Sequence, residues 1–217
     1  MAVTGLILVG FLLMHMYGNL KMFMGEEAFN HYAEWLKGDI LYPLVPSGWF
    51  IWIFRVFLLA AVVLHMWSAI YLWHRSAKAR GSKYQHVTRK VQTYSARTMR
   101  WGGIILALFI IFHILQFTTK TVPLGYDLEQ TQHSPYLMFL GAFSSPLVWV
   151  IYAVCMIAVC MHVRHGFWSA FTTLGANLSK KAERVLNGLA YFVAILLYVG
   201  FMLPPTFVFL HLAPFGG

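Results

Sequence analysis

Four histidines lie inside four long apolar stretches of the chain, and their type and spacing make them the strongest candidates for chemistry. They are His15, His65, His113 and His162, which follow one another at intervals of about 50 residues. An ionisable side chain inside a membrane span is costly and by default marks function. Neutral imidazole is also the commonest metal ligand among side chains. One histidine in each of four spans therefore indicates metal cofactors held between helices.

The composition indicates an integral membrane protein. The 217 residues are 59% hydrophobic and 11% charged, whereas a soluble domain carries about 25% charged residues. Runs of about 20 apolar residues, the length that crosses a bilayer as a helix, occur at about 1–23, 50–74, 101–120, 147–168 and 187–211. We predict an all-α fold, a single transmembrane domain over 1–217 whose first four helices form a dihaem bundle. The first run has no charged leader or cleavage site, which favours a retained helix.

The charged residues divide the connecting segments into two classes. Residues 75–100 hold eight Lys and Arg residues and no acid, and residues 169–186 are also basic. Segments rich in Lys and Arg stay in the cytoplasm, so we predict a cell-membrane protein with a cytoplasmic N-terminus and an outer C-terminus. The basic segment could bind anionic lipid heads or an acidic partner. A nucleic-acid partner is not expected, because no aromatic–basic interleaving or binding motif accompanies the charge.

The predicted direction of each helix gives the depth of its histidine. With a rise of 1.5 Å per residue, His15 and His113 lie about 21 and 18 Å from the inner end of their helices. His65 and His162 lie about 13 and 9 Å from it. The depths predict an outer pair, His15 with His113, and an inner pair, His65 with His162. The members of each pair come from alternate helices, which lie diagonally across a four-helix bundle.

Each predicted pair could hold one haem iron. Two imidazoles fill both axial positions and leave no open site for oxygen, an arrangement that suits electron transfer. The chain contains no Cys-x-x-Cys-His segment, so the haem would be bound non-covalently. Two haems at two depths would form an electron path across the membrane. The alternative is that each histidine hydrogen-bonds a neighbouring helix.

A few other polar or small residues inside or near the spans have two interpretations each. Arg55 could bind a propionate of the outer haem or extend to the outer headgroups. Asn19, one turn beyond His15, could reach the same propionate or bond the helix backbone. Gly102 and Gly103 could admit a macrocycle or only a close helix. Cys155 and Cys160 are expected to be small packing residues.

The five spans with this histidine arrangement closely resemble the cytochrome b membrane-anchor subunit of succinate dehydrogenase and fumarate reductase, in its single-chain dihaem form. The resemblance covers essentially the whole chain. The sequence from His15 to Asn19, followed by Gly25 to Asn30, is similar to the end of the first helix and the outer loop in Gram-positive members. It implies that the first and third histidines bind one haem and the second and fourth the other.

The resemblance also implies partners and a substrate. The family's partners are a flavoprotein carrying FAD and an iron–sulphur protein, both cytoplasmic, and its membrane substrate is a quinone, often menaquinone. The chain alone would not oxidise succinate. Quinone could react beside the inner haem, at the inner ends of the first, second and fourth helices and the partner protein. If it reacts instead near the outer haem, Glu34 or Asp39 could exchange its protons with the outside; otherwise both are solvated residues. Some dihaem fumarate reductases carry a glutamate two residues before the fourth ligand, where this chain has Cys160.

Three rival classes make different predictions. A quinol–cytochrome c reductase cytochrome would place two histidines on each of two helices, unlike this chain. The cytochrome b subunits of hydrogenase and formate dehydrogenase remain an alternative. A haem-free transporter would show interrupted helices. Here the Pro204-Pro205 pair, predicted to break the fifth helix near its outer end, is the main such feature.

Overall fold

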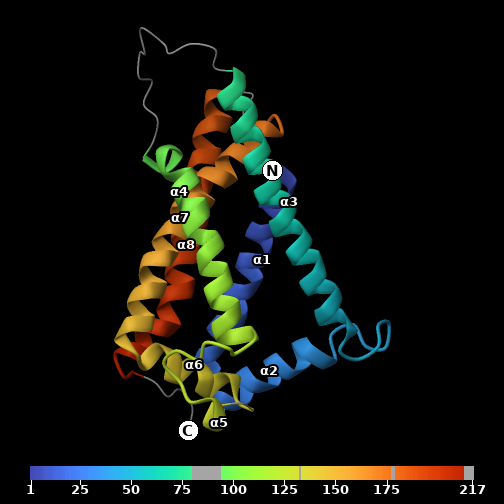
Figure 1. The fold of residues 1–217 in the computed structure, drawn as a ribbon, viewed down its shortest axis with the longest axis vertical. Helices are drawn as coiled ribbons and strands as arrows, with labels where there is room; N and C mark the ends of the chain where they lie inside the picture. The colour runs from blue at the N-terminus through green and yellow to red at the C-terminus, as the bar shows by residue number, and fades with distance from the viewer. Residues whose placement is uncertain (80–93, 132, 177–178, 213–217) are drawn as a thin grey trace.

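The computed structural model describes residues 1–79, 94–131, 133–176 and 179–212, and the regular structure within these residues is helical (Figure 1). Five helices in it are long and apolar enough to cross a membrane, which confirms the predicted fold class. They are α1 (Ala2–Leu20) with its continuation η1 (Lys21–Met24), α3 (Trp49–Ala79), α4 (Tyr94–His113) with its continuation η2 (Ile114–Thr118), α7 (Pro146–Thr173) and α8 (Lys180–Phe209).

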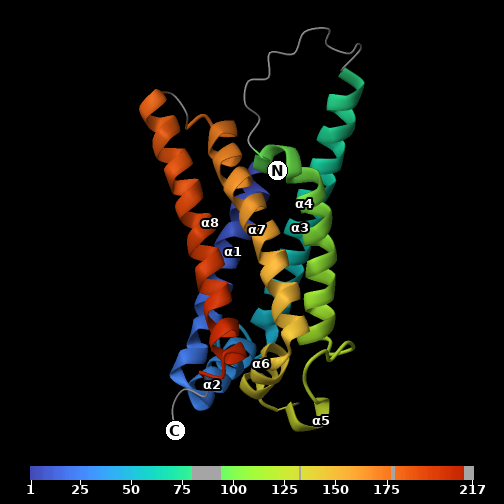
Figure 2. The same cartoon turned by 90° about the vertical axis from the view of Figure 1, so that its left-hand side faces the viewer.

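Helix α7 is the centre of the bundle. It packs against α1, α4 and α8, and α8 in turn packs against α1. Helix α3 contacts α1 and α2 and leans away from α7 toward one end of the molecule (Figures 1 and 2). One apolar cluster fills the space between α1, α7 and α8, with Val9, Met16, Met156, Val159, Val163, Leu197 and Met202 at its core.

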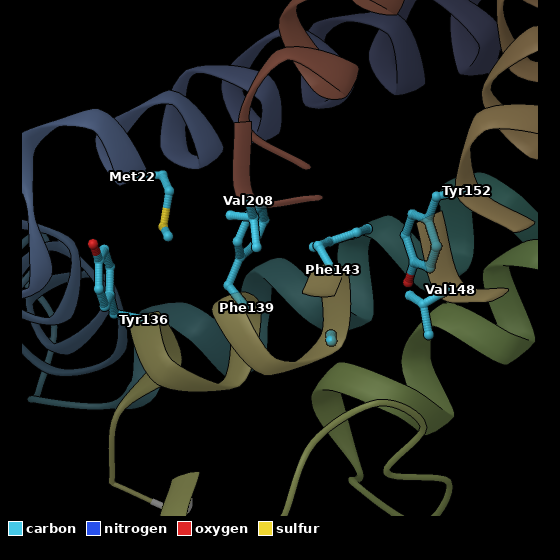
Figure 3. Close-up of a cluster of buried hydrophobic side chains, with 8 residues drawn as sticks. Met22, Tyr136, Phe139, Phe143, Val148, Tyr152 and Val208 are labelled. Atoms are coloured by element: carbon cyan, nitrogen blue, oxygen red, sulfur yellow. The ribbon is translucent and has the colours of Figure 1, made fainter. Parts of the chain in front are cut away.

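Three short helices cover one end of the bundle, in segments that the sequence analysis treated as loops. They are α2 (Glu26–Gly38), α5 (Leu128–Thr131) and α6 (Pro135–Ser144) (Figure 2). A second apolar cluster lies beneath them and joins α6 to α7 and α8 (Figure 3). Its buried members are Met22, Tyr136, Phe139, Ala142, Phe143, Val148, Tyr152 and Val208.

Local capping explains why these short helices form. Gly25 precedes α2 at φ 90°, a backbone conformation that glycine adopts without steric cost. Ser134 caps α6 by accepting a hydrogen bond from the Leu137 backbone N–H at 3.2 Å, and Pro135 occupies the first turn, where its missing N–H is not needed. The Ser134 hydroxyl also donates to Glu26 Oε1 at 2.8 Å. This bond ties α6 to α2.

The two ends of the bundle differ in charge. Six of the seven acidic residues lie at the end covered by α2, α5 and α6, hereafter the acidic end. The opposite end, hereafter the basic end, holds the N-terminus, the end of α3 and the α7–α8 connection (Figures 1 and 2). Much of the predicted basic segment, residues 80–93, lies outside the described residues. Described basic residues at this end include Arg75, Lys78, Arg100, Lys180, Lys181 and Arg184.

The fifth helix differs from its predicted form at both ends. It begins at Lys180, not near 187, because Ser179 caps it by accepting from the Ala182 backbone N–H at 3.1 Å. The predicted break at Pro204-Pro205 is wrong, since α8 continues through both prolines to Phe209. Neighbouring helices can support backbone groups that proline leaves unpaired. Here Trp149 of α7 donates to Thr206 Oγ1 at 3.2 Å, just beyond the prolines.

The contact of α8 with α1 depends on a glycine. A Cβ added at Gly200 would lie 2.2 Å from Met16 Sδ, whereas one added at Gly188 of the same helix meets no atom within 4 Å. Overpacking of this kind typically costs about 1–3 kcal/mol. Gly200→Ala should therefore lower the thermal unfolding temperature of the purified protein in detergent.

Gly188→Ala is the matched control, because it makes the same chemical change in open space on the same helix. It should leave the unfolding temperature unchanged or raise it slightly, since alanine favours helix over glycine. Met16→Ala added to Gly200→Ala should recover part of the loss. Equal effects of the two glycine substitutions would show that the α1–α8 contact is not the cause.

Candidate functional site

One pair of histidines lies between α1 and α4, toward the acidic end. His113 is the last residue of α4, and its ring centre is 5.8 Å from that of His15, with the ring planes inclined by 77°. Aromatic rings enclose the pair: Phe11 stacks on His15 at 5.4 Å, and Phe201 of α8 approaches it to 5.7 Å. Both imidazoles are half-buried. We call them the acidic-end pair.

A second pair lies between α3 and α7, toward the basic end. The ring centres of His65 and His162 are 6.3 Å apart, and their planes are inclined by 63°. Glycines flank both rings: a Cβ added at Gly5 would lie 3.4 Å from His65 Cε1, and one added at Gly103 would lie 3.8 Å from His162 Cε1. We call these histidines the basic-end pair. The structure thus brings together the same two pairs that the depths of the four histidines give.

The side-chain nitrogens of the two pairs have different partners. His113 Nδ1 lies 2.9 Å from the Tyr152 hydroxyl of α7, and His65 Nδ1 lies 3.1 Å from Thr4 Oγ1 of α1. His162 Nδ1 is buried and has no hydrogen-bond partner among the described residues. A buried, unsatisfied nitrogen costs about 1–3 kcal/mol, so this histidine is not explained by hydrogen bonding within the bundle.

The number of ligands limits which metal group these pairs can hold. Among the described residues, no three His, Cys, Asp or Glu side chains are close enough together to hold a metal ion. Protein zinc sites need three or four such ligands, so the pairs do not fit a bare ion of that kind. A haem needs only axial ligands from the protein, and two histidines provide both.

The distances within the pairs fit the same group. A histidine nitrogen binds a first-row metal such as zinc at about 2.0–2.1 Å. Two imidazoles on opposite sides of one metal therefore have ring centres roughly 6 Å apart. The separations of 5.8 and 6.3 Å match this value. The separation within each pair is thus compatible with two imidazoles that share one metal group.

Comparison with known proteins finds one relative that is named as a cytochrome. Over 201 residues, the chain is 25% identical to the succinate dehydrogenase cytochrome b558 subunit of Bacillus subtilis (strain 168). The alignment covers 92% of this chain and 90% of that protein. No family model matches the chain, and no solved structure matches it. The chain is therefore similar, over nearly its whole length, to a membrane cytochrome b subunit.

The other candidate residues lie apart from the histidine rings. Arg55 is exposed on α3, with its guanidinium 4.8 Å above the Trp52 ring. Asn19 Nδ2 donates to the His15 backbone carbonyl at 3.0 Å. Of the two roles considered for Asn19, this is the bond to the helix backbone. Glu34 of α2 and Asp39, which follows it, are exposed. Cys155 and Cys160 are free thiols, both half-buried.

The polar residues beside the histidines were not predicted from the sequence. Tyr152 lies on α7 among aromatic rings, Gln116 lies beyond His113 on the turn η2, and Thr4 lies near the start of α1. The fully buried Gln116 was open to detection, because an uncharged polar side chain inside a membrane span usually hydrogen-bonds across helices. Tyr152 and Thr4 carry no comparable signal, since tyrosine and threonine are common in apolar helices.

Proposed function

We propose that this chain is the dihaem cytochrome b anchor of a succinate:quinone oxidoreductase. In this role it passes electrons between a cytoplasmic iron–sulphur subunit and quinone in the membrane, and it is not catalytic alone. The observation that carries the proposal is the meeting of four histidines as two facing pairs at two levels of one bundle. The similarity to a succinate dehydrogenase cytochrome b558 subunit supports the choice of enzyme. We further propose the single-chain, Gram-positive type, with menaquinone as substrate.

Within this proposal each side chain has a limited task. His15 and His113 would hold one haem b as axial ligands, and His65 and His162 would hold a second. Haem bound in this way supplies one-electron transfer. Aromatic rings, such as Phe11 and Phe201 at His15, make the surroundings of these ligands apolar. An apolar surrounding of this kind is one of the means by which a protein sets a metal group's potential.

The charge of the two ends suggests where the partners bind. The basic end would face the cytoplasm under the positive-inside rule. The iron–sulphur subunit, with the flavoprotein that carries FAD, would dock there, and the basic-end pair would be the first to receive electrons. The acidic end would face outward. Glu34 and Asp39 are exposed there, as a carboxylate must be if it exchanges quinone protons with water.

The helices themselves weigh against the transporter alternative. A transporter of the broken-helix kind needs unwound segments at mid-membrane that coordinate its substrate. Helices α3, α7 and α8 are continuous over 31, 28 and 30 residues. The four histidines of α1, α3, α4 and α7 also meet in pairs. His65 and His113 do hydrogen-bond a neighbouring helix, but such bonds do not require the rings to meet in pairs.

The first test is the haem content. The correctly assembled complex should contain two haems b for each copy of this chain, because each histidine pair provides both axial ligands of one iron. A pyridine haemochrome assay against a protein determination measures this ratio. One haem, or none, in the assembled complex would refute the dihaem proposal.

A second test separates the two pairs. His113→Ala should remove the haem of the acidic-end pair and leave the other, and His65→Ala should do the reverse. Low-temperature absorption spectra of membranes, in which two haems give distinct α-bands, would follow each loss. His133→Ala is the control, because this histidine lies in the segment before α6, outside both pairs. Equal loss of both haems in either ligand variant, with the complex assembled, would contradict the pairing.

A third test addresses orientation. In a Cys155→Ala, Cys160→Ala background, single cysteines replacing Lys181 and Glu129 would lie at the basic and acidic ends, where both native side chains are exposed. A membrane-impermeant maleimide should label the Glu129→Cys variant in intact cells, and the Lys181→Cys variant only after disruption. The reverse pattern would place the basic end outside and overturn the proposed docking side.

A further inference from the structure

A chain of hydrogen bonds leads away from His113 through two buried side chains. The Tyr152 hydroxyl lies 2.9 Å from His113 Nδ1 and donates to Gln116 Oε1 at 2.9 Å. Gln116 Nε2 donates to the Leu124 backbone carbonyl at 2.8 Å. Gln116 is completely buried, and Tyr152 is 6% exposed. The hydrogen bonds thus run from the half-buried histidine through two buried side chains to the connection that follows η2.

A change of helix type places Gln116 in this chain. Directly after His113 the backbone widens into the π-helical turn η2 (Ile114–Thr118). Such turns are rare and frequently occur at functional sites. The Tyr126 hydroxyl donates to the Gln116 backbone carbonyl, which the widened turn leaves accessible. The turn and this bond together hold the Gln116 side chain toward Tyr152.

The direction of every bond in the chain follows from its last member. The Leu124 carbonyl can only accept, so the Gln116 amide must present its NH₂ to Leu124 and its oxygen to Tyr152. The Tyr152 hydroxyl has one proton and donates it to that oxygen. Only its lone pairs remain for His113. His113 Nδ1 must then carry the proton and donate it, which leaves Nε2 without a proton.

We infer that Tyr152 and Gln116 are positioning residues that fix His113 in the tautomer that binds metal through Nε2. This inference rests on the proposed function, because it assigns the free nitrogen to the haem of the acidic-end pair. Metal-binding histidines generally donate their second ring N–H to an acceptor, which orients the ring and makes the ligand more basic. Donation by Tyr152 to Gln116 strengthens the hydroxyl oxygen as that acceptor, since linked hydrogen bonds polarise one another.

Packing alone does not explain the two polar groups. The Tyr152 ring is already held by Phe109 and Phe143, with ring centres 5.1 and 4.9 Å away. Phenylalanine would make these contacts without a hydroxyl to satisfy. Leucine at position 116 would avoid burying an amide in an apolar bundle. The hydroxyl and the amide have a role only through the bonds that they form, and these bonds end at a histidine ring.

The test measures the midpoint potential of each haem in membranes that contain the whole complex. Wild-type membranes must first show two haems, and the one lost in His113→Ala identifies the haem of the acidic-end pair. Tyr152→Phe keeps the ring but removes the acceptor of the His113 proton, so His113 becomes a weaker donor and ferric iron is less favoured. The midpoint potential of that haem should rise by about 59 mV for one electron, which corresponds to a tenfold change in the preference of the site for ferric over ferrous iron.

Three further variants distinguish the hydrogen-bond chain from His113 through Tyr152 to Gln116, hereafter the relay, from a general effect on packing. Gln116→Leu should shift the same haem in the same direction, and combining it with Tyr152→Phe should add little, because both act through one chain of bonds. Tyr136→Phe is the matched control. It removes a buried hydroxyl of the apolar cluster that also contains Tyr152, one with no hydrogen-bond partner among the described residues, and should move neither potential. The haem of the basic-end pair should be unchanged in all variants.

Each result bears on the inference separately from the proposed function. A selective shift, or selective loss of the acidic-end haem in Tyr152→Phe or Gln116→Leu, supports the relay. Unchanged potentials in both variants, with two haems present, would overturn it and leave the dihaem proposal standing. An equal shift in Tyr136→Phe, or joint loss of both haems in both relay variants, would also overturn it, because these side chains would then hold the bundle together and not one ligand.

Discussion

A polar group inside an apolar bundle needs a partner, and this constraint determines the arrangement around the four histidines. An unpaired imidazole there costs free energy, whereas two imidazoles directed at one metal group are stabilised together. The rings meet across alternate helices at 5.8 and 6.3 Å. The position of α7 follows from the same need, because it carries His162 and also supplies Tyr152 to His113. One helix thus serves both levels of the bundle.

The features predicted correctly from the sequence are those set by long-range regularity. Hydropathy over about 20 residues locates a membrane helix, and the constant helical rise gives the depth of each histidine, so the five helices and the two histidine pairs could be anticipated. Short features were harder. Helices α2 and α6 depend on Gly25 and Ser134, whose capping signals stand out only once the neighbouring segment is known to pack. At Pro204-Pro205 the local breaking tendency did not end α8, which continues to Phe209 where it packs on α7.

The relay could not have been predicted for a different physical reason. Tyr152 and Gln116 are 36 residues apart, on different helices, and the π-helical turn that turns the amide inward has no sequence signature of its own. The π-helical turn is accompanied by two contacts: the Gln116 backbone carbonyl accepts from Tyr126, and the Gln116 side-chain amide donates to the Leu124 carbonyl. Each of these contacts forms only after the helices have packed. A buried glutamine indicates that a partner exists but not which one.

The two levels of the bundle meet the same requirement with different side chains. At the basic end, the Thr4 hydroxyl donates to the Met1 carbonyl at 3.0 Å, so only its lone pairs are available to His65 Nδ1. At the acidic end, the Tyr152 hydroxyl donates to Gln116, so only its lone pairs are available to His113 Nδ1. In both pairs a hydroxyl that is already a donor elsewhere sets the proton on Nδ1 and leaves Nε2 free. Because the two hydroxyls come from α1 and α7, the tautomers of His65 and His113 are controlled independently, and the properties of one level can change without the other.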